Sequence, residues 1–594
     1  MYLKCHRRTK DGKEHRYWSI AEKRRVSCGR TVDRHVLYLG EINDSQKESW
    51  LRSIEAIDEQ TREAKQLALF PADRPMPSHA MEHGVQVRMD RLSLRRPRQW
   101  GACWAFCRTW AELKLDAFWR ERLGPSREGT SWYDVLVVLT AYRLLSPGSE
   151  WRLHREWYDR SAMGDLLGVD FAVVAKDTLY RCLDRLPEHK EALFDFLAER
   201  WRDLFGVTYD IVLYDLTSTY FESDPPFAEG DKRRHGYSRD HRPDCVQVVI
   251  ALVVTPEGFP LAYEVLPGNA AESTTLPGFL DKIETRFGKA RRVWVMDRGI
   301  PTEDHLATMR GRDTAYLVGT PKGRLTALEQ ALLARPWQTA RPDVKVKLLP
   351  EDGEVYVWVE SHDRVHKERS MRRRRLKAYW ARLRSLQSQR PAYETLLLKL
   401  GAAQQQAGRA AALVTIEWPS PPDPKASSRR VDFTFRLDRK RLRAVRRREG
   451  RYLLRSNLTA SDPAQLWSFY LQLVEVEEAF RNLKGDLAIR PVFHQLEHRI
   501  EAHIFVAFLA YCVHITLRQK LRLHAPGLTP RQLLDKLAAI QMLDVHIPTT
   551  DGRELIFARH TQPEQDQQIL LTRLGWTLPP QPPPRISGKN AEQM

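Results

Sequence analysis

The chain has few cysteines and no apolar stretch at its N-terminus. Both features argue against a secreted, disulfide-bonded protein. Its 594 residues include only 7 cysteines, an odd and scattered set that is typical of free thiols in a reducing compartment. Cys103 and Cys107 can share one helix face, but no second Cys/His pair stands near them, which favours a buried helix face over a zinc site. The first residues, MYLKCHRRTK, are charged where a secretory signal needs an apolar stretch. We therefore expect a cytoplasmic protein.

Long apolar runs are also scarce. The longest run near the C-terminus, residues 504–513, is shorter than the roughly 20 residues that a membrane span needs, so we expect no membrane partner. Positive charge, in contrast, is abundant. The chain has 95 Lys+Arg against 76 Asp+Glu, a formal net charge of +19, which predicts a polyanionic partner.

The pattern of the sequence changes several times along the chain. A helical pattern gives way near residue 207 to short β-rich runs that alternate with helices, which predicts an α/β sheet. Within it, the continuous apolar run 246–254 is typical of a central strand covered on both faces. The predicted segments are a basic N-terminal module (1–70), a helical region (80–206), the first part of an α/β core (207–324), a basic and partly β insertion (325–458), the second part of the core (459–520), a helical C-terminal region (521–577) and a disordered tail (578–594).

Two stretches of the insertion hold most of the excess charge. Residues 361–390 have 11 Lys/Arg against 2 acids, and residues 429–451 have 11 against 3, so together they account for 17 of the net charge of +19. The first contains the run Arg372, Arg373, Arg374 and Arg375 with aromatic residues close behind it. A solvated charge run would look similar, but two such runs beside strand-like segments favour contact with a nucleic acid backbone.

Two aspartates close apolar, strand-like runs: Asp215 in VLYDLTS and Asp297 in VWVMDRG. The carboxyl ends of strands in an open α/β sheet form its functional crevice, where carboxylates can hold a metal ion. Either residue alone could equally accept hydrogen bonds in a turn or helix cap. The pair therefore needs a third element to indicate a site.

That element is a helix that starts at a Ser-Asp-Pro cap and continues through QLWSFYLQLVEVEEAFRNLKG. At about 100° per residue, Glu477 falls inside the apolar stripe that includes Leu473 and Phe480, whereas Glu475 lies opposite and Glu478 on the margin. A carboxylate on a buried face needs compensation, and a divalent cation is the strongest available. Glu477 is therefore the predicted third ligand.

Tyr470 and Lys484 each lie seven residues from Glu477, which places all three on nearly the same face of a straight helix. A phenol and an ammonium beside a metal-bound carboxylate would suit the oxygens of a phosphodiester. The alternative is an internal salt bridge between Glu477 and Arg481, four residues on. That pair explains the charge but not the apolar setting.

The chain resembles insertion-sequence transposases of the DDE class that carry the Y-x2-R-x3-E-x6-K signature. Here the signature reads Tyr470, Leu473 in place of the arginine, Glu477 and Lys484. Further matching motifs occur in the same order as in the family: Asp215-Leu216-Thr217-Ser218, the loop 236–244, Gly268-Asn269, Asp297-Arg298-Gly299 and the RPVFH run 490–494. The resemblance spans about residues 207–518.

The resemblance implies an RNase H-like mixed sheet flanked by helices, with a helical N-terminal region and a partly β insertion. In it Asp215 ends the first strand, Asp297 ends the neighbouring fourth strand and Glu477 reaches the same place. It further implies two Mg²⁺ ions, replaceable by Mn²⁺, held about 4 Å apart by these three carboxylates. Leu473 removes one expected cation, which Arg481 or Arg490 could supply. Arg298, with Arg481 and the 372–375 run, joins the expected DNA contacts.

The implied activity is cleavage at the element's terminal inverted repeats, which the region 80–206 would bind, followed by attack of the freed 3′-OH on target DNA. Double-stranded DNA is then the partner, a homodimer joins the two ends, and the protein associates with the bacterial nucleoid. Two alternatives stay open: a catalytically silent DNA-binding protein or repressor derived from such an enzyme, and a nuclease of the same fold without strand transfer.

Overall fold

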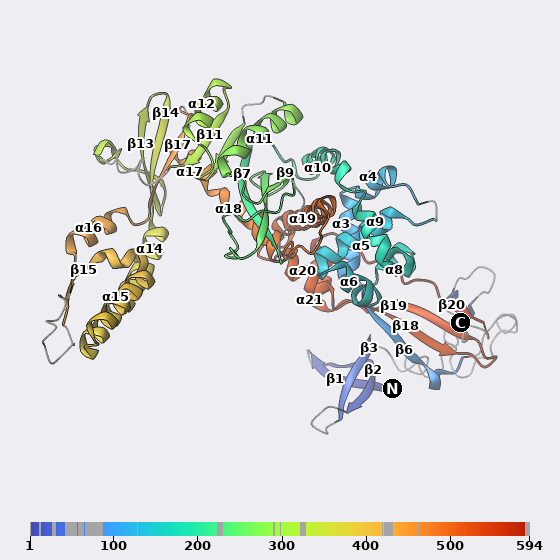
Figure 1. Cartoon of the computed structure of the whole chain (residues 1–594). Coiled ribbons are helices and arrows are strands. Elements are labelled where there is room, and N and C mark those ends of the chain that lie inside the picture. The colour runs from blue at the N-terminus through green and yellow to red at the C-terminus, as the bar shows by residue number, and fades with distance from the viewer. Residues whose placement is uncertain are drawn as a thin grey trace. The chain divides into compact units, whose positions relative to one another are not determined.

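The computed structural model describes residues 2–10, 13–25, 31–41, 56–57, 64–65, 87–126, 129–222, 230–288, 292–297, 299–320, 328, 330–418, 420, 432–459 and 462–588 (Figure 1). The chain forms two compact units. The first, called here the helical unit, comprises Met1–Val207, Ser218–Val248 and Ala479–Met594. The second, called the sheet unit, comprises Thr208–Thr217 and Val249–Glu478. The two are described separately.

A nine-stranded mixed sheet runs through the sheet unit. β7 is parallel to β10 and β10 to β11, while β11, β17, β14, β13 and β12 pair antiparallel. This confirms the predicted α/β class and the RNase H-like sheet in which the fourth strand neighbours the first. In sheet order the strands are β12 (Gln338–Arg341), β13 (Val344–Glu351), β14 (Glu354–Ser361), β17 (Arg451–Ser456), β11 (Ala315–Gly319), β10 (Val293–Met296), β7 (Ile211–Phe221), β8 (Val246–Val254) and β9 (Pro260–Pro267).

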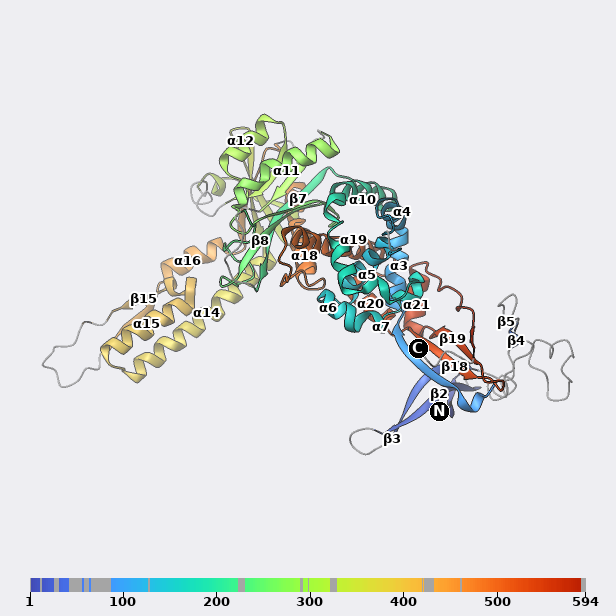
Figure 2. The same ribbon diagram turned by 45° about the vertical axis from the view of Figure 1, so that its right-hand side comes forward.

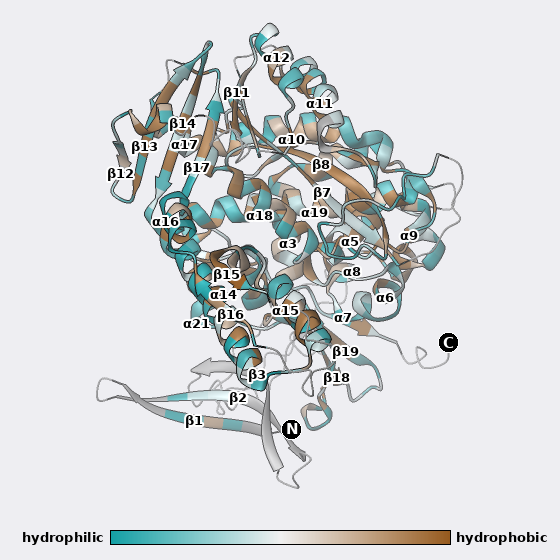
Figure 3. Ribbon diagram, turned by 60° about the vertical axis from the view of Figure 1, so that its left-hand side comes forward, coloured by the Kyte–Doolittle hydropathy of each residue, from teal (hydrophilic) through white to brown (hydrophobic). Residues whose placement is uncertain are grey.

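The interior of the sheet follows from its apolar runs. Every residue of β8 is buried, including Gln247, which interrupts its apolar run, and Figure 3 shows the strand as hydrophobic. The helices α11 (Glu272–Phe287) and α12 (Glu303–Gly311), both labelled in Figure 2, come after β9 and β10 in the chain. The ring of Phe279 on α11 lies 5.2 Å from the ring of Tyr214 on β7, so α11 covers the sheet beside Asp215.

The predicted insertion has different limits in the structure. β12, β13, β14 and β17 lie inside the segment 325–458, yet they extend the main sheet. The true interruption runs from the end of β14 to the start of β17. Its elements are α14 (His362–Gln389), α15 (Tyr393–Ala407), β15 (Val414–Glu417), β16 (Thr434–Leu437) and α16 (Arg439–Arg448).

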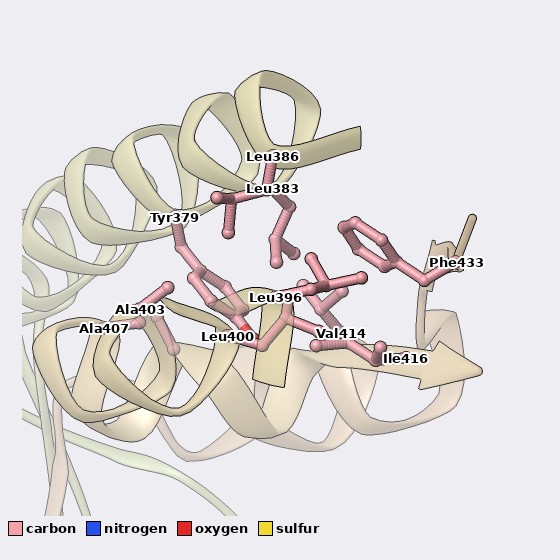
Figure 4. Close-up of a cluster of buried hydrophobic side chains, with 11 residues drawn as sticks. Tyr379, Leu383, Leu386, Leu396, Leu400, Ala403, Ala407, Val414, Ile416 and Phe433 are labelled. Carbon is pink, nitrogen blue, oxygen red and sulfur yellow. The ribbon is translucent and has the colours of Figure 1, made fainter. Parts of the chain in front are cut away.

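This interruption has its own hydrophobic core. Leu383 and Leu386 of α14 pack against Leu396 and Leu400 of α15, with Phe433 beside them (Figure 4). β15 and β16 pair antiparallel next to this core. The insertion is therefore a small α+β subdomain.

The helical unit is built around α19. By length and composition α19 could cross a membrane, which the ten-residue run counted from the sequence did not indicate. Its most apolar window is 94% buried inside the protein, because neighbouring helices cover it. The helices of this unit are α3 (Gly101–Glu112), α4 (Leu115–Arg122), α5 (Trp132–Leu145), α6 (Glu150–Arg152), α7 (Tyr158–Arg160), α8 (Met163–Leu167), α9 (Lys176–Leu183), α10 (Lys190–Phe205), α19 (Glu497–His524), α20 (Pro530–Leu537) and α21 (Gln565–Arg573).

Three small sheets lie in the described part of this unit: the pair β4 (Ala56–Ile57) and β5 (Ala64–Lys65), a three-stranded N-terminal sheet, and a four-stranded sheet that departs from the predicted segments. Strands occur in both regions predicted to be helical and within the predicted disordered tail. Arg98, a buried residue of β6 (Ser93–Gln99), donates hydrogen bonds to Asp544 at 2.8 Å and to Asp165 at 2.6 Å. These contacts join residues that are far apart in the chain, so no local sequence pattern reveals them. The four-stranded sheet is β20 (Arg585–Ser587), β19 (Glu554–His560), β18 (Gln541–Pro548) and β6 (Ser93–Gln99), and the N-terminal sheet is β1 (Tyr2–Lys10), β2 (Lys13–Arg25) and β3 (Thr31–Glu41).

The thiols of α3 agree with a buried helix face. Cys103 is fully buried, and burial raises the pKa of its thiol to about 12, so it stays protonated. Burial raises the pKa of Cys107 as well.

A buried histidine makes the helical unit sensitive to acid. Burial, with the nearby charge of Arg518, lowers the pKa of His514 on α19 to about 4. Because the unfolded chain binds this proton near pH 6.5 and the folded chain does not, stability is full above that pH and falls as the pH drops toward 4. We expect a loss of about 2 kcal/mol in the free energy of unfolding between pH 7 and pH 5 from this residue.

Urea unfolding followed by circular dichroism at the two pH values measures this loss. His514→Gln should reduce the pH dependence by about that amount, whereas the same change at His524, exposed at the end of the same helix, should leave it unchanged. Equal pH dependence in wild type and His514→Gln would contradict the expectation.

Candidate active site

Three acidic residues that lie far apart in the sequence line one cavity of the sheet unit. Asp215, Asp297 and Glu477 border this space, whose volume is about 380 Å³. The predicted Tyr470 lines it as well. The remaining lining residues are Gly319, Thr320, Arg364, Arg451, Tyr452, Leu453, Leu471, Leu473, Val474 and Val476.

Strand register brings the two aspartates together. β7 and β10 are parallel, and Met296 is paired with Tyr214, so the next residues, Asp297 and Asp215, lie side by side on neighbouring strands. Asp297 directly follows β10, as predicted. Asp215 does not end its strand: β7 continues to Phe221. The Leu216 backbone N–H donates to Asp215 Oδ1 at 2.8 Å.

The helix that carries Glu477 is shorter than predicted. Its cap is as expected, since the Asp462 side chain accepts from the Ala464 N–H and Pro463 occupies the first turn. The helix is then interrupted at Gln472, which separates α17 (Pro463–Leu471) from α18 (Leu473–Lys484). A single helical wheel drawn across the two helices gave the wrong face for Glu477.

Glu477 is exposed at the cavity, and its predicted burial in the apolar stripe was wrong. The buried side of α18 contains Leu473, Val476 and Phe480, while Val474 is 52% exposed. Val476 precedes Glu477 by about 100°, so the buried face is centred on that side and Glu477 lies at its edge. The carboxylate thus reaches the cavity without being desolvated by the core.

An aromatic group supports the wall beside Glu477. The Tyr470 ring lies 5.7 Å from the Tyr452 ring on β17. Trp467 Nε1 donates to the Tyr452 hydroxyl at 2.7 Å, which ties α17 to the sheet. The predicted position of Tyr470 close to Glu477 agrees with this arrangement.

Lys484 does not line the cavity. In the helical unit its Nζ bonds Asp240 Oδ1 at 2.7 Å, and Arg490 pairs with the same carboxylate. Burial lowers the pKa of Lys484, although the hydrogen bond to Asp240 opposes that shift. Seven residues of α-helix span about 10 Å, which explains how a residue near the Glu477 meridian lies outside the cavity.

The other predicted DNA contacts are distributed differently. Arg481 is exposed, does not line the cavity, and forms no ion pair with Glu477 among the residues that the structure describes. Arg372 is nearly buried and pairs with Glu449, so its charge is compensated internally and its prediction as a DNA contact is not supported. The other three arginines of this run, Arg373, Arg374 and Arg375, are exposed on α14. Arg298 lies outside the described residues.

Two arginines of the cavity were missed by the sequence reasoning. Arg364 comes from the first turn of α14 and Arg451 from the first residue of β17. Both fall inside the basic stretches recognised in the sequence. Their proximity to the carboxylates depends on the pairing of β14 with β17, whose register is long-range and gave no local signal.

The donor set of the cavity fits a hard divalent cation. It offers three carboxylates, and within the described part of the chain neither Asp297 nor Glu477 has an ion-pair partner. Oxygen donors of this kind suit Mg²⁺ or Mn²⁺. Of the described residues, one set of three has its ligand atoms within 4.8 Å of one another, and it is Glu150, His494 and His503 of the helical unit. The cavity carboxylates are spaced more widely than that set.

A match to a known protein family covers all three carboxylates of the cavity. Residues 207–513 match the family described as "Transposase DDE domain", which covers Asp215, Asp297 and Glu477. No curated protein matches the chain. Among solved structures, the chain is similar to piggyBac transposase in a synaptic complex with hairpin DNA, at 11% identity over 75% of this chain and 88% of that chain. The TM-score of 0.29 is too low to support a conclusion.

Proposed function

Because the chain belongs to the transposase DDE domain family, we propose that it is the DNA transposase of a bacterial insertion sequence. It would bind the terminal inverted repeats, hydrolyse a phosphodiester at each element end, and use the freed 3′-OH to attack target DNA. The observation that carries the proposal is the gathering of Asp215, Asp297 and Glu477 around one cavity. Two copies of the chain would join the two ends.

The three carboxylates would hold Mg²⁺, with Mn²⁺ as a substitute. When bound, the metal would supply activation of water and stabilisation of the leaving 3′-oxygen. The chain's own groups would orient the DNA, since Tyr470, Arg364 and Arg451 all line the cavity. Guanidinium groups bind phosphate oxygens strongly through charge-assisted hydrogen bonds.

Double-stranded DNA is the proposed partner, and the insertion offers a surface for it. α16, with the sequence RKRLRAVRRR, has no buried residue, and seven of its ten residues are Lys or Arg; Figure 3 shows it as mostly hydrophilic. A helix without a buried face is stabilised by other means, here by the Asp438 cap, whose Oδ1 accepts from the Arg441 N–H at 2.9 Å. Such a helix is suited to phosphate contacts, and binding should weaken steeply with salt.

The test is a cleavage assay on DNA that carries the inverted repeats flanking the reading frame. We expect nicking at the element ends with Mg²⁺ or Mn²⁺ and no nicking with EDTA, while binding in a gel-shift assay persists. Joining of a labelled 3′ end to a target plasmid distinguishes a transposase from a nuclease without strand transfer. Binding without cleavage in every metal would favour the silent DNA-binding protein.

A further inference from the structure

The cavity lacks the arginine that the family signature places beside the catalytic glutamate. Leu473 stands where the family signature has an arginine, and its apolar side chain lines the cavity next to Glu477. The sequence offered Arg481 or Arg490 as replacements. Neither lines the cavity, and Arg490 is paired with Asp240. The replacement cation must come from another element.

We propose that Arg364 of the insertion binds a phosphate of the DNA strand in the cavity and so replaces the signature arginine. This inference rests on the proposed function, because it assigns a substrate contact within the same site. Arg364 shares the cavity wall with Leu473 and with the three carboxylates, yet it belongs to α14, more than 100 residues before Leu473 in the chain.

The partners of the two cavity arginines favour Arg364 over Arg451. Arg451 is 22% exposed, pairs with Glu360, and lies 4.9 Å over the Trp358 ring, so it is held by the sheet. Arg364 is 49% exposed, and its ion pair with Glu368 is an i,i+4 contact of 3.1 Å. Exposed pairs of this kind are weak and exchange readily. The Arg364 guanidinium can therefore turn to a phosphate.

The location of Arg364 in its helix supports a role with an anion. It lies in the first turn of α14, where the positive end of the helix dipole disfavours a cation. Its guanidinium lies 4.8 Å over the ring of Tyr452, another lining residue, which directs it along the cavity wall. A phosphate bound there would meet both the guanidinium and the favourable end of the helix.

The first turns of α14 are fixed firmly enough to position this side chain. Gly450 has a φ of +72°, and a Cβ at that position would come within 2.7 Å of the Val365 backbone nitrogen. The Gly450 N–H donates to Glu368 Oε2 at 2.9 Å. Glu449 pairs with Arg369 and Arg372 of the next turn. α14 is therefore clamped to the turn that precedes β17.

The test measures single-turnover cleavage of element-end DNA at saturating full-length protein. We expect Arg364→Ala to lower the rate by about 100-fold, as when one oriented donor is lost from an active site, and Arg364→Lys to retain part of it. Adding Leu473→Arg to Arg364→Ala should restore at least about tenfold, since it returns a cation to the same cavity. Arg335→Ala, an exposed arginine of the sheet unit that does not line the cavity, should leave the rate unchanged.

Two results would overturn the inference while the proposed function stands. One is an active wild type with an equally active Arg364→Ala protein. The other is a slow Arg364→Ala protein that also melts at a lower temperature and regains no activity with either Lys at 364 or Arg at 473, which would indicate a structural role. A wild-type protein that fails to cleave in any metal would overturn the proposed function itself.

Discussion

Replacing Glu477 by Gln is expected to lower DNA-end cleavage by more than about 1000-fold, because an amide is a poor ligand for a divalent cation. The structure predicts that only one of the three glutamates on α18 has this effect. Glu475 and Glu478 are on the same helix, but neither lines the cavity. The same Glu→Gln change at either of them should leave cleavage within about twofold. Asp215→Asn and Asp297→Asn should behave like Glu477→Gln.

Cleavage and binding are measured together in this comparison. A gel-shift assay with element-end DNA should give the same affinity for all five variants as for the wild type, since the substitutions change only the cavity and one helix face. A Glu477→Gln protein that cleaves at the wild-type rate would refute the active site. If Glu478→Gln lost cleavage instead, Glu478 and not Glu477 would be the third metal ligand.

The sequence predicted the parts of this site that depend on local patterns. β8 could be recognised from its apolar run, in which Gln247 is the one polar residue, and the start of α17 from the Asp462-Pro463 cap. Asp297 could be placed because it directly follows a short apolar strand. These features are set by residues close together in the chain, and the structure has each of them.

Other parts depend on contacts that a local pattern does not encode. The interruption at Gln472 has no glycine or proline to announce it, and Glu477 after it is exposed, not buried as inferred. The carboxylate of Asp240 that binds Lys484 lies 244 residues away in the chain. Arg364 reaches the cavity only because β14 pairs with β17 across the whole insertion. The acidic residues could therefore be named from their motifs, although the burial inferred for Glu477 was wrong, and most of their cationic neighbours could not be predicted.

A second large effect is expected in the helical unit, where Glu150 lies in a buried polar network. Arg143 Nη2 lies 3.8 Å from Glu150 Oε1 and 3.3 Å from His503 Nδ1. His494 Nε2 lies 3.3 Å from the same Glu150 oxygen. Burial alone would raise the pKa of Glu150, but the hydrogen bond with His494 and the charge of Arg143 outweigh it and hold that pKa below its usual value.

The network holds the chain that follows α18. Arg143 Nη1 donates to the Ala488 carbonyl at 3.2 Å, and His503 Nε2 lies 3.1 Å from the Ile489 carbonyl. Because Arg143 is a donor to Nδ1, His503 must carry its proton on Nε2 and is neutral. Burial, followed by the charge of Arg143, lowers the pKa of His503 well below its usual value, which agrees with this tautomer.

Glu150→Leu should lower the free energy of unfolding of the helical unit by about 3–5 kcal/mol, because it leaves the Arg143 guanidinium buried without its carboxylate. Glu156→Leu is the matched control: Glu156 is 57% exposed and its i,i+4 pair with Arg152 is long, at 3.9 Å. Its loss should cost less than about 0.5 kcal/mol. Urea unfolding followed by circular dichroism measures both.

The double variant Arg143→Met with Glu150→Leu separates the cost of an unpaired charge from the value of the pair. Replacing both charged groups by apolar ones of similar size should recover most of the loss, since desolvating an ion pair cancels much of its attraction. The two histidines and Glu150 could instead hold a metal, and then EDTA would lower the unfolding midpoint of the wild type. We expect EDTA to leave it unchanged, because Arg143 already supplies the positive charge and both nitrogens of His503 are engaged. A double variant no more stable than Glu150→Leu would show that the pair itself, and not the unpaired guanidinium, determines the stability of this network.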